Sequence, residues 1–251
     1  MRAKLKAGFR TDIGKMRVVN EDALLVLPAD GLFAVADGVG GSNSGDIASR
    51  RAVNGIEEFF RENPVSEADG MEGEVRHDWF KDYFLRCFRK INQDIRNAAA
   101  IEQDNSGMAT TAVAAYFDGD IVYITNIGDS RAYILRAGEI TQLTEDHSYV
   151  TDLVNAGTLT KSEAREHPQK NMITRALGAG AEADPDFYRH DIEQGDCVLL
   201  CSDGLHGELT DEEIRSEFEK ESDLNSVCKL LVQAANEKGG HDNITIVCAA
   251  G

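Results

Sequence analysis

Three aspartates stand at the ends of apolar runs, each beside glycine or asparagine: Asp37 in VADGVGG, Asp203 in LLCSDGL and Asp242 in GGHDNITIV. A carboxylate at the edge of a buried strand is held rigidly at the rim of a sheet. Three such groups converge only when something offsets their charge, because like charges at short range are costly. Mg²⁺ and Mn²⁺ are hard cations that take carboxylate, carbonyl and water oxygens as ligands. The pattern therefore indicates an oxygen-ligated metal site.

Three further acids extend this pattern. Asp129 in NIGDSR stands at another strand edge, and Glu21 and Asp22 in RVVNED precede an apolar run. A single Asp-Gly is more often a turn or a cap than a ligand, but four aspartates at strand edges in one chain weaken that interpretation. The spacing alone supports a metal site and no particular reaction.

Arg17 adds a group that could address a phosphate. It lies four residues before Glu21, and on an extended segment positions 17, 19 and 21 share one face. A guanidinium beside a metal site suits bidentate binding of phosphoryl oxygens. The alternative interpretation is a surface arginine paired with an acid, and the sequence alone leaves the two in balance.

The elements that would position these groups are strands at both ends of the chain with helices gathered between them. Strands are predicted for residues 23–27, 32–36, 196–201 and 243–249. Helices are predicted after Ser42 or Ser44 as N-cap, along the aromatic stripe from Trp79 to Ile95, and over residues 211–218 and 224–237. Residues 108–143 are β-rich and punctuated by Gly-Asp pairs, which predicts strands joined by hairpins. This order favours a single α+β domain.

Composition excludes several classes of protein. Twenty-six Lys+Arg against forty-four Asp+Glu leave a formal net charge of −18 over 251 residues. Nucleic acid and anionic membrane surfaces are both bound through Lys and Arg, so neither is an expected partner. No apolar run approaches the roughly 18 residues of a membrane span. The five cysteines are dispersed without metal-ligand spacing, which predicts buried thiols in a reducing, cytoplasmic protein.

A set of short motifs occurs in one order along almost the whole chain, from residue 12 to residue 248. They are Asp12-x-Gly14, Arg17-x-x-x-Glu21-Asp22, Asp37-Gly38-x-Gly40-Gly41, Gly107-x-x-Thr110-Thr111, Gly128-Asp129-Ser130-Arg131, Thr174-Arg175-Ala176-Leu177-Gly178, Ser202-Asp203-Gly204 and Asp242-Asn243. Together they resemble the metal-dependent, type 2C serine/threonine protein phosphatases in their compact bacterial form. Each motif is short, but their joint order and spacing are specific.

The resemblance implies a four-layer αββα sandwich, in which two antiparallel sheets pack together between helices. One catalytic domain would fill residues 1–251, with residues 146–185 inserted as a flap that shapes substrate access. Two Mn²⁺ or Mg²⁺ ions would lie between the sheets. The resemblance implies a bridging ligand at Asp37, a carbonyl ligand at Gly38, further ligands at Asp203 and Asp242, and Glu21 on metal-bound water with Asp22 in support. Asp129 with Asp203 would form a third, weaker site, and Arg17 would bind the phosphate.

The implied reaction is hydrolysis of phosphoserine and phosphothreonine in proteins by a water or hydroxide that bridges the two ions. Two positions depart from the family pattern. Val39 stands where eukaryotic relatives have a histidine that resembles a general acid, which leaves metal-bound water, His206 or His147 as the donor. Ala109 stands where glycine is common, and we expect this change to affect packing only.

Other functions remain open on the same fold. One is a non-catalytic module that binds phosphoproteins, although such a module should have lost some of the metal-binding acids. Another is a phosphodiesterase acting on nucleic acid, which the net charge disfavours. By resemblance we expect a monomer that acts on phosphorylated proteins and opposes a bacterial serine/threonine kinase.

Overall fold

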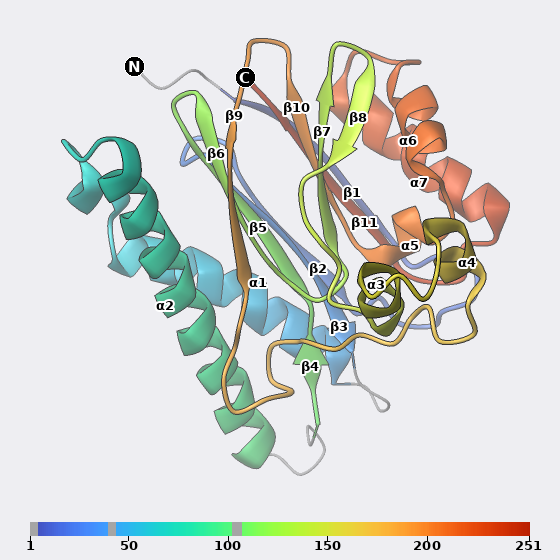
Figure 1. Ribbon diagram of the computed structural model, residues 1–251, viewed down its shortest axis with the longest axis horizontal. Helices are drawn as coiled ribbons and strands as arrows, with labels where there is room; N and C mark the ends of the chain where they lie inside the picture. Colours follow the sequence, from blue (N-terminus) through green and yellow to red (C-terminus); the bar gives the residue numbers. More distant parts are fainter. Residues whose placement is uncertain (1–4, 40–43, 102–106) are drawn as a thin grey trace.

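The computed structural model describes residues 5–39, 44–101 and 107–251, which form two antiparallel sheets (Figure 1). The five-stranded sheet has the order β1, β11, β10, β7, β8, with bounds Lys6–Asp12, Ile244–Ala250, Cys197–Cys201, Arg131–Arg136 and Glu139–Gln142. The six-stranded sheet has the order β2, β3, β5, β6, β9, with bounds Asp22–Leu27, Leu32–Val39, Ala112–Asp118, Ile121–Ile127 and Asp186–Asp191. Its sixth strand, β4 (Ala109–Thr110), pairs with the end of β3.

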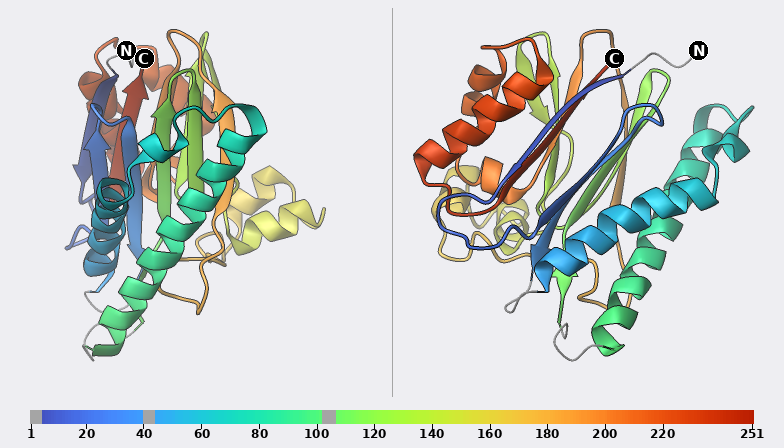
Figure 2. Two further views of the ribbon diagram at one scale, coloured as in Figure 1. Left: turned by 90° about the vertical axis from the view of Figure 1, so that its left-hand side faces the viewer. Right: turned by 180° about the vertical axis from the view of Figure 1, so that it is seen from behind.

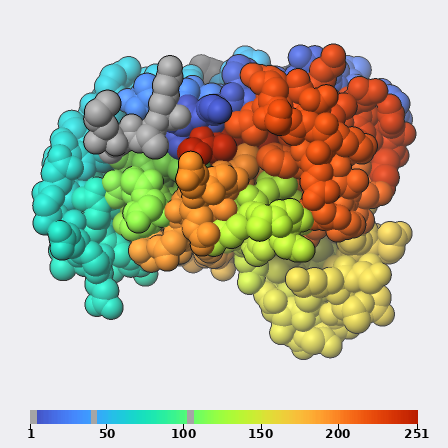
Figure 3. All heavy atoms as spheres, turned by 90° about the horizontal axis from the view of Figure 1, so that it is seen from above, coloured from blue at the N-terminus to red at the C-terminus, as the bar shows by residue number. Residues whose placement is uncertain are grey.

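Helices cover the outer face of each sheet. Two long helices, α1 (Gly45–Glu62) and α2 (Gly73–Ile101), lie on the six-stranded sheet, joined by the short 3₁₀ helix η1 (Val65–Ala68). The five-stranded sheet is covered by α5 (Asp203–His206), α6 (Asp211–Phe218) and α7 (Leu224–Lys238). Figure 2 shows the four layers from two sides. The segment with α3 (Tyr149–Asn155) and α4 (Lys161–Glu166) protrudes from one corner as the yellow lobe in Figure 3.

The layers follow from alternation along the strands. In β3, Leu32, Ala34 and Ala36 face the helices, while Phe33 and Val35 face the other sheet. Strands β5, β10 and β11 alternate in the same way, so that both faces of each central strand are buried. The result is one apolar layer between the sheets and one beneath each helical layer. The predicted αββα sandwich is confirmed.

Several expected elements are present at nearly the predicted bounds, including β2, β3, β10, β11, α1, α2, α6 and α7. The link at Gly128-Asp129-Ser130 is different from the prediction. It is not a hairpin turn, because β6 belongs to one sheet and β7 to the other. The chain crosses between sheets at this point, and the crossing places Asp129 at their seam. Strand β9 was not predicted, because its sequence DFYRHD lacks an apolar alternation.

Two local predictions on the N-terminal side of the site need correction. Residues 17–21 form no strand, and Val18 and Val19 lie in a bend, so Arg17 and Glu21 do not share the face of a strand. Ser44 occupies the N-cap position of α1, yet its side chain makes no capping hydrogen bond. Gly40, Gly41 and Ser42, which the motif and the capping prediction also included, lie outside the described residues.

The cysteines behave as predicted from their spacing. All five are free and buried, and Cys197 and Cys201 both face the helical layer over the five-stranded sheet. In the described part of the chain, no helix has the length and apolar character needed to cross a lipid bilayer.

Candidate active site

The acids singled out in the sequence come together where the two sheets meet at one end. Asp37 lies near the end of β3, directly opposite Asp22 at the start of β2 in the strand register. Asp203 is the first residue of α5, and Asp242 lies two residues before β11. Asp129 reaches the same region from the crossing between β6 and β7. Five separate segments therefore contribute one carboxylate each.

Burial and mutual repulsion raise the pKa values of these carboxyls. Burial is the largest cause for Asp37 and Asp129, and the neighbouring aspartates add to it, so that both pKa values lie well above the usual range. The same two causes raise the pKa of Asp22 to about 7 and that of Asp203 to about 6. The carboxyls of Asp37 and Asp203 also interact directly with each other. Without a cation, a proton offsets part of the negative charge.

The donor set fits hard divalent cations. Asp22 Oδ1 and Asp203 Oδ1 are buried and have no hydrogen-bond partner, and a buried acceptor without a partner is costly. Among the residues that the structure describes, no three His, Cys, Asp or Glu side chains form a finished metal-ligating group. Asp242 forms an ion pair with Arg17, and its charge still acts on Asp37 and Asp203. The carboxylate oxygens of these residues are of the kind that Mg²⁺ and Mn²⁺ prefer as ligands.

Arg17 and Glu21 each have a partner at the edge of the cluster. Arg17 NH2 lies 2.6 Å from Asp242 Oδ2, and its side chain remains 47% exposed. Glu21 accepts a hydrogen bond from the backbone N–H of Gly45, at the first turn of α1. Glu21 thus takes the capping role that was predicted for a serine, at a helix end that favours negative charge. Burial still raises the pKa of Glu21 overall.

Close backbone approaches hold the segments together. A side chain at Gly38 would collide with the carbonyl of Gly45, and one at Gly204 would collide with the carbonyl of Asn243. Glycine at these two positions lets β3 meet α1 and lets α5 meet the loop before β11. The distances between the carboxylates are therefore set by backbone packing.

Asn243 is the main positioning residue that the sequence did not reveal. Its Oδ1 accepts from the backbone N–H of Glu21 at 2.8 Å, and its Nδ2 donates to the carbonyls of Ile13 and Val19, both at 3.0 Å. It is 3% exposed. The Asp242-Asn243 pair drew attention to this residue, but no local pattern could show that its amide ties down residues 13–21.

Ser202 was also missed as a positioning residue. Its hydroxyl donates to Asp22 Oδ2 at 2.8 Å and accepts from the backbone N–H of Thr245 at 3.0 Å. Ser202 therefore links β11 to Asp22 on the opposite sheet. Its place before Asp203 was the only signal in the sequence.

The two histidines considered as proton donors have structural partners. His206 is buried and its Nε2 donates to the carbonyl of Asp129 at 2.9 Å. Burial, together with the charge of Arg131, lowers the pKa of His206 to about 3, so the ring is neutral at pH 7. His147 Nδ1 accepts from the N–H of Gly128, and its Nε2 lies 3.2 Å from Asp186 Oδ2. In this arrangement, each ring holds the crossing that carries Asp129.

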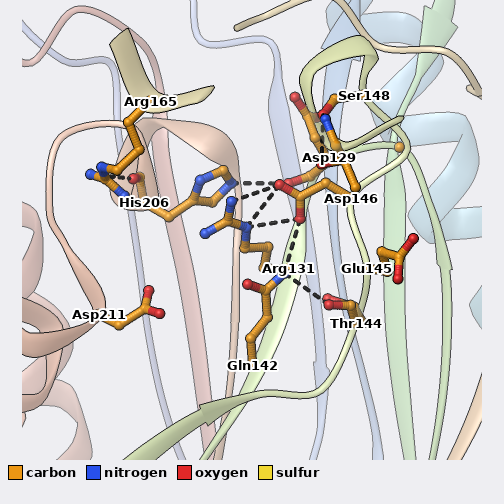
Figure 4. Close-up of polar contacts among 12 residues, drawn as sticks. Asp129, Arg131, Gln142, Thr144, Glu145, Asp146, Ser148, Arg165, His206 and Asp211 are labelled. Carbon is orange, nitrogen blue, oxygen red and sulfur yellow. Dashed lines mark hydrogen bonds and ion pairs between the residues drawn. The ribbon is translucent and has the colours of Figure 1, made fainter. Parts of the chain in front are cut away.

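A cavity of about 640 Å³ reaches the cluster from the side of Asp129 and Asp203. Its other walls are the α3–α4 segment and the α5–α6 region. Figure 4 shows the ion pair at its inner end, where Arg131 binds Asp146 through two nitrogens, the shortest contact being 2.6 Å. Burial alone would raise the pKa of Asp146, but the charge and hydrogen bonds of Arg131 lower it. This pair joins β7 to the beginning of the protruding segment.

The fold and the site define a class: an αββα sandwich with clustered carboxylates and an arginine where its two sheets meet. The family model described as protein phosphatase 2C matches residues 15–245. The serine/threonine phosphatase stp of Listeria monocytogenes is 35% identical over 246 residues, covering 97% of this chain and 94% of the relative. Protein phosphatase PhpP of Streptococcus pneumoniae is 38% identical over 248 residues, covering 96% of each chain.

Solved structures agree with the sequence relatives. The serine/threonine phosphatase PstP/Ppp of Mycobacterium tuberculosis superposes with a TM-score of 0.85 at 34% identity, covering 98% of both chains. A catalytic domain of PstP in complex with two manganese ions has a TM-score of 0.83 at 32% identity, covering 98% of this chain and 97% of that one. The chain belongs to the protein phosphatase 2C family. It is a serine/threonine protein phosphatase.

Proposed function

We propose that this phosphatase removes phosphate from phosphoserine and phosphothreonine at the carboxylate cluster, with two bound Mn²⁺ or Mg²⁺ ions. The observation that supports this most is the convergence of buried carboxyls with raised pKa values and two oxygens without partners. The two manganese ions in the related PstP catalytic domain favour the same site chemistry.

The ligands in this proposal are Asp37, the carbonyl of Gly38, Asp203 and Asp242. Glu21, with Asp22 in support, holds a water beside them, and Asp129 with Asp203 forms a third, weaker site. When bound, the ions supply Lewis acidity, which offsets the carboxylate charge and activates water for attack on phosphorus.

Arg17 binds the non-bridging phosphoryl oxygens in this proposal. Its guanidinium is half exposed and has nitrogens to spare beyond the contact with Asp242. The pairing aims the guanidinium at the edge of the carboxylate cluster, where a phosphate would meet both. In the transition state the negative charge is spread over the three non-bridging phosphoryl oxygens, and a fixed guanidinium stabilises it there.

The proton that the leaving serine or threonine needs does not come from His206. That ring is neutral and its single N–H is used by the carbonyl of Asp129. Val39, 40% exposed and two residues from Asp37 on the same strand face, supplies no proton. We assign the donor to water held at the site, as the position of Val39 in the motif already suggested.

We propose that residues 146–185 act as a flap within a single catalytic domain. This segment walls the cavity that leads to Asp129 and Asp203, with Lys161, Arg165 and Lys170 on its inner side. We further propose, from the family resemblance of the sequence motifs, that the enzyme acts on phosphorylated proteins as a monomer and opposes a serine/threonine kinase.

Release of phosphate from a phosphothreonine peptide, with and without Mn²⁺, tests the proposal. Wild type should require the metal, and Asp37→Asn should lose activity while keeping its circular dichroism spectrum. Asp78→Asn, which changes an exposed acid on α2, is the matched control and should behave as wild type. Metal-independent turnover, or full activity of Asp37→Asn, would overturn the assignment of the site. Binding of the peptide without release would instead support the non-catalytic alternative.

A further inference from the structure

The loop that carries Arg17 also presents apolar side chains to solvent. Val18 is 91% exposed, Met16 67% and Val19 42%. None of the three belongs to the apolar clusters that pack the sheets and helices. We call these three residues the apolar loop face. In a soluble protein, grouped apolar exposure of this kind often marks a binding surface.

The loop is held in place without burying these side chains. The backbone N–H groups of Lys15 and Met16 both donate to the carbonyl of Gly240, at 2.8 and 3.2 Å. The amide of Asn243 binds the carbonyls of Ile13 and Val19. The conformation is therefore fixed by polar contacts to the loop before β11, and the apolar loop face has no evident role in stabilising it.

The apolar loop face lies beside Arg17, which favours the protein substrate as the partner that binds there. Met16 and Val18 are the sequence neighbours of Arg17, about 3.8 Å away between Cα atoms. An extended substrate advances by about 3.3 Å per residue. We expect the residues on either side of a phosphoresidue whose phosphate contacts Arg17 to pass beside Met16 and Val18.

Charge decides which flanking residues fit. The cluster beside the loop is acidic, with Asp242 and Glu21 next to Arg17, and the chain as a whole has a formal charge of −18. Acidic residues near the phosphate would be repelled. Apolar residues would instead lose water against Met16, Val18 and Val19.

We infer that the apolar loop face selects protein substrates with apolar side chains directly flanking the phosphoserine or phosphothreonine. This inference rests on the proposed function, because it requires the phosphate to bind at Arg17. It assigns substrate selection to residues 16–19 in addition to the protruding segment on the other side of the site.

Two phosphothreonine peptides of equal length and charge test the inference, one with leucine and one with serine on either side of the phosphothreonine. Wild type should show a kcat/KM about three- to tenfold higher for the leucine peptide, as expected for partial burial of one or two side chains. Val18→Ser and Met16→Gln should each reduce this preference, and together they should abolish it. Hydrolysis of p-nitrophenyl phosphate, which has no flanking residues, should be unchanged in all variants.

Val75→Ser is the matched control, since Val75 is 66% exposed on the first turn of α2, away from the loop. It should keep the full preference for the leucine peptide. Equal rates on the two peptides, or a preference that survives the double variant, would overturn the inference while leaving the proposed function intact. Failure to release phosphate from either peptide would overturn the proposed function itself. A dimer in sedimentation velocity that Val18→Ser dissociates would assign the face to a second copy of the chain and also overturn the inference.

Discussion

Removing divalent cations should destabilise this protein, and the loss should grow as the pH rises. In the metal-free protein the carboxyls of Asp22 and Asp203 have pKa values of about 7 and about 6, against 3.8 for an ordinary aspartate. Between pH 4 and pH 7 the native state therefore binds more protons than the unfolded state. The free energy of unfolding then falls as the pH increases through this window. Bound cations replace the protons and should remove the dependence.

The size of the effect follows from the shift of one carboxyl. For Asp203 the rise from 3.8 to about 6 corresponds to roughly 3 kcal/mol at about 1.4 kcal/mol per pKa unit. Asp22 interacts with the same charges, so its contribution overlaps and is not added. For a protein of this size, about 3 kcal/mol is equivalent to a change in melting temperature of roughly 6–12 °C.

Calorimetry in EDTA at pH 5 and pH 8, repeated with Mn²⁺, measures this directly. About 1.4 kcal/mol of this lies above pH 5, because the pKa of Asp203 is about 6. The metal-free protein should therefore melt roughly 3–6 °C lower at pH 8 than at pH 5, and Mn²⁺ should close most of that gap. The variant Asp203→Asn distinguishes the effect of this carboxyl from general charge repulsion at high pH. It should make the melting temperature of the metal-free protein less dependent on pH, and it should abolish activity. The control Asp78→Asn should keep the same pH dependence as wild type. A metal-free wild type that is as stable at pH 8 as at pH 5 would refute the reasoning.

Three further changes probe the site and its supports. Arg17→Lys keeps the charge but loses the planar fork, so kcat/KM on a phosphothreonine peptide should fall about 10- to 100-fold; an unchanged value would remove Arg17 from phosphate binding. Asn243→Ala deletes three hydrogen bonds and should cost about 2–3 kcal/mol in urea unfolding, together with activity; a loss below about 0.5 kcal/mol would show that the loop is held by other contacts. Asp146→Ala leaves Arg131 buried without its partner and should cost about 3–5 kcal/mol, whereas Asp146→Leu combined with Arg131→Met should recover most of it. If the double variant is no more stable than Asp146→Ala, the cost does not come from the unpaired charge.

Much of the fold could be predicted because its signals are local. The aromatic stripe of α2 follows from helical spacing, and the apolar run of β3 follows from burial on both faces of a strand. The acids at strand ends could also be recognised, since a buried strand that ends in an acid is visible in a few residues. These signals need no knowledge of which segments become neighbours.

The supports of the site could not be predicted, because they join distant parts of the chain. Asn243 binds a backbone group 222 residues away at Glu21, and Glu21 caps a helix that begins at Gly45. The turn at Gly128 reads locally as a hairpin, yet β6 and β7 pair with different strands. In each case, the local sequence is compatible with more than one structure, and the tertiary arrangement determines which of them forms.

These supports also explain how the protein keeps like charges together. The frame around the carboxylates consists of the backbone contact of Gly38 with Gly45, that of Gly204 with Asn243, and the amide of Asn243. None of these contacts depends on the charge of an aspartate. Folding of the rest of the chain therefore supplies the free energy that brings the carboxylates close. A cation that binds to the folded protein relieves the repulsion between the carboxylates without first having to order the site. The affinity of the cation and the increase in the free energy of unfolding that it causes therefore report the same interaction.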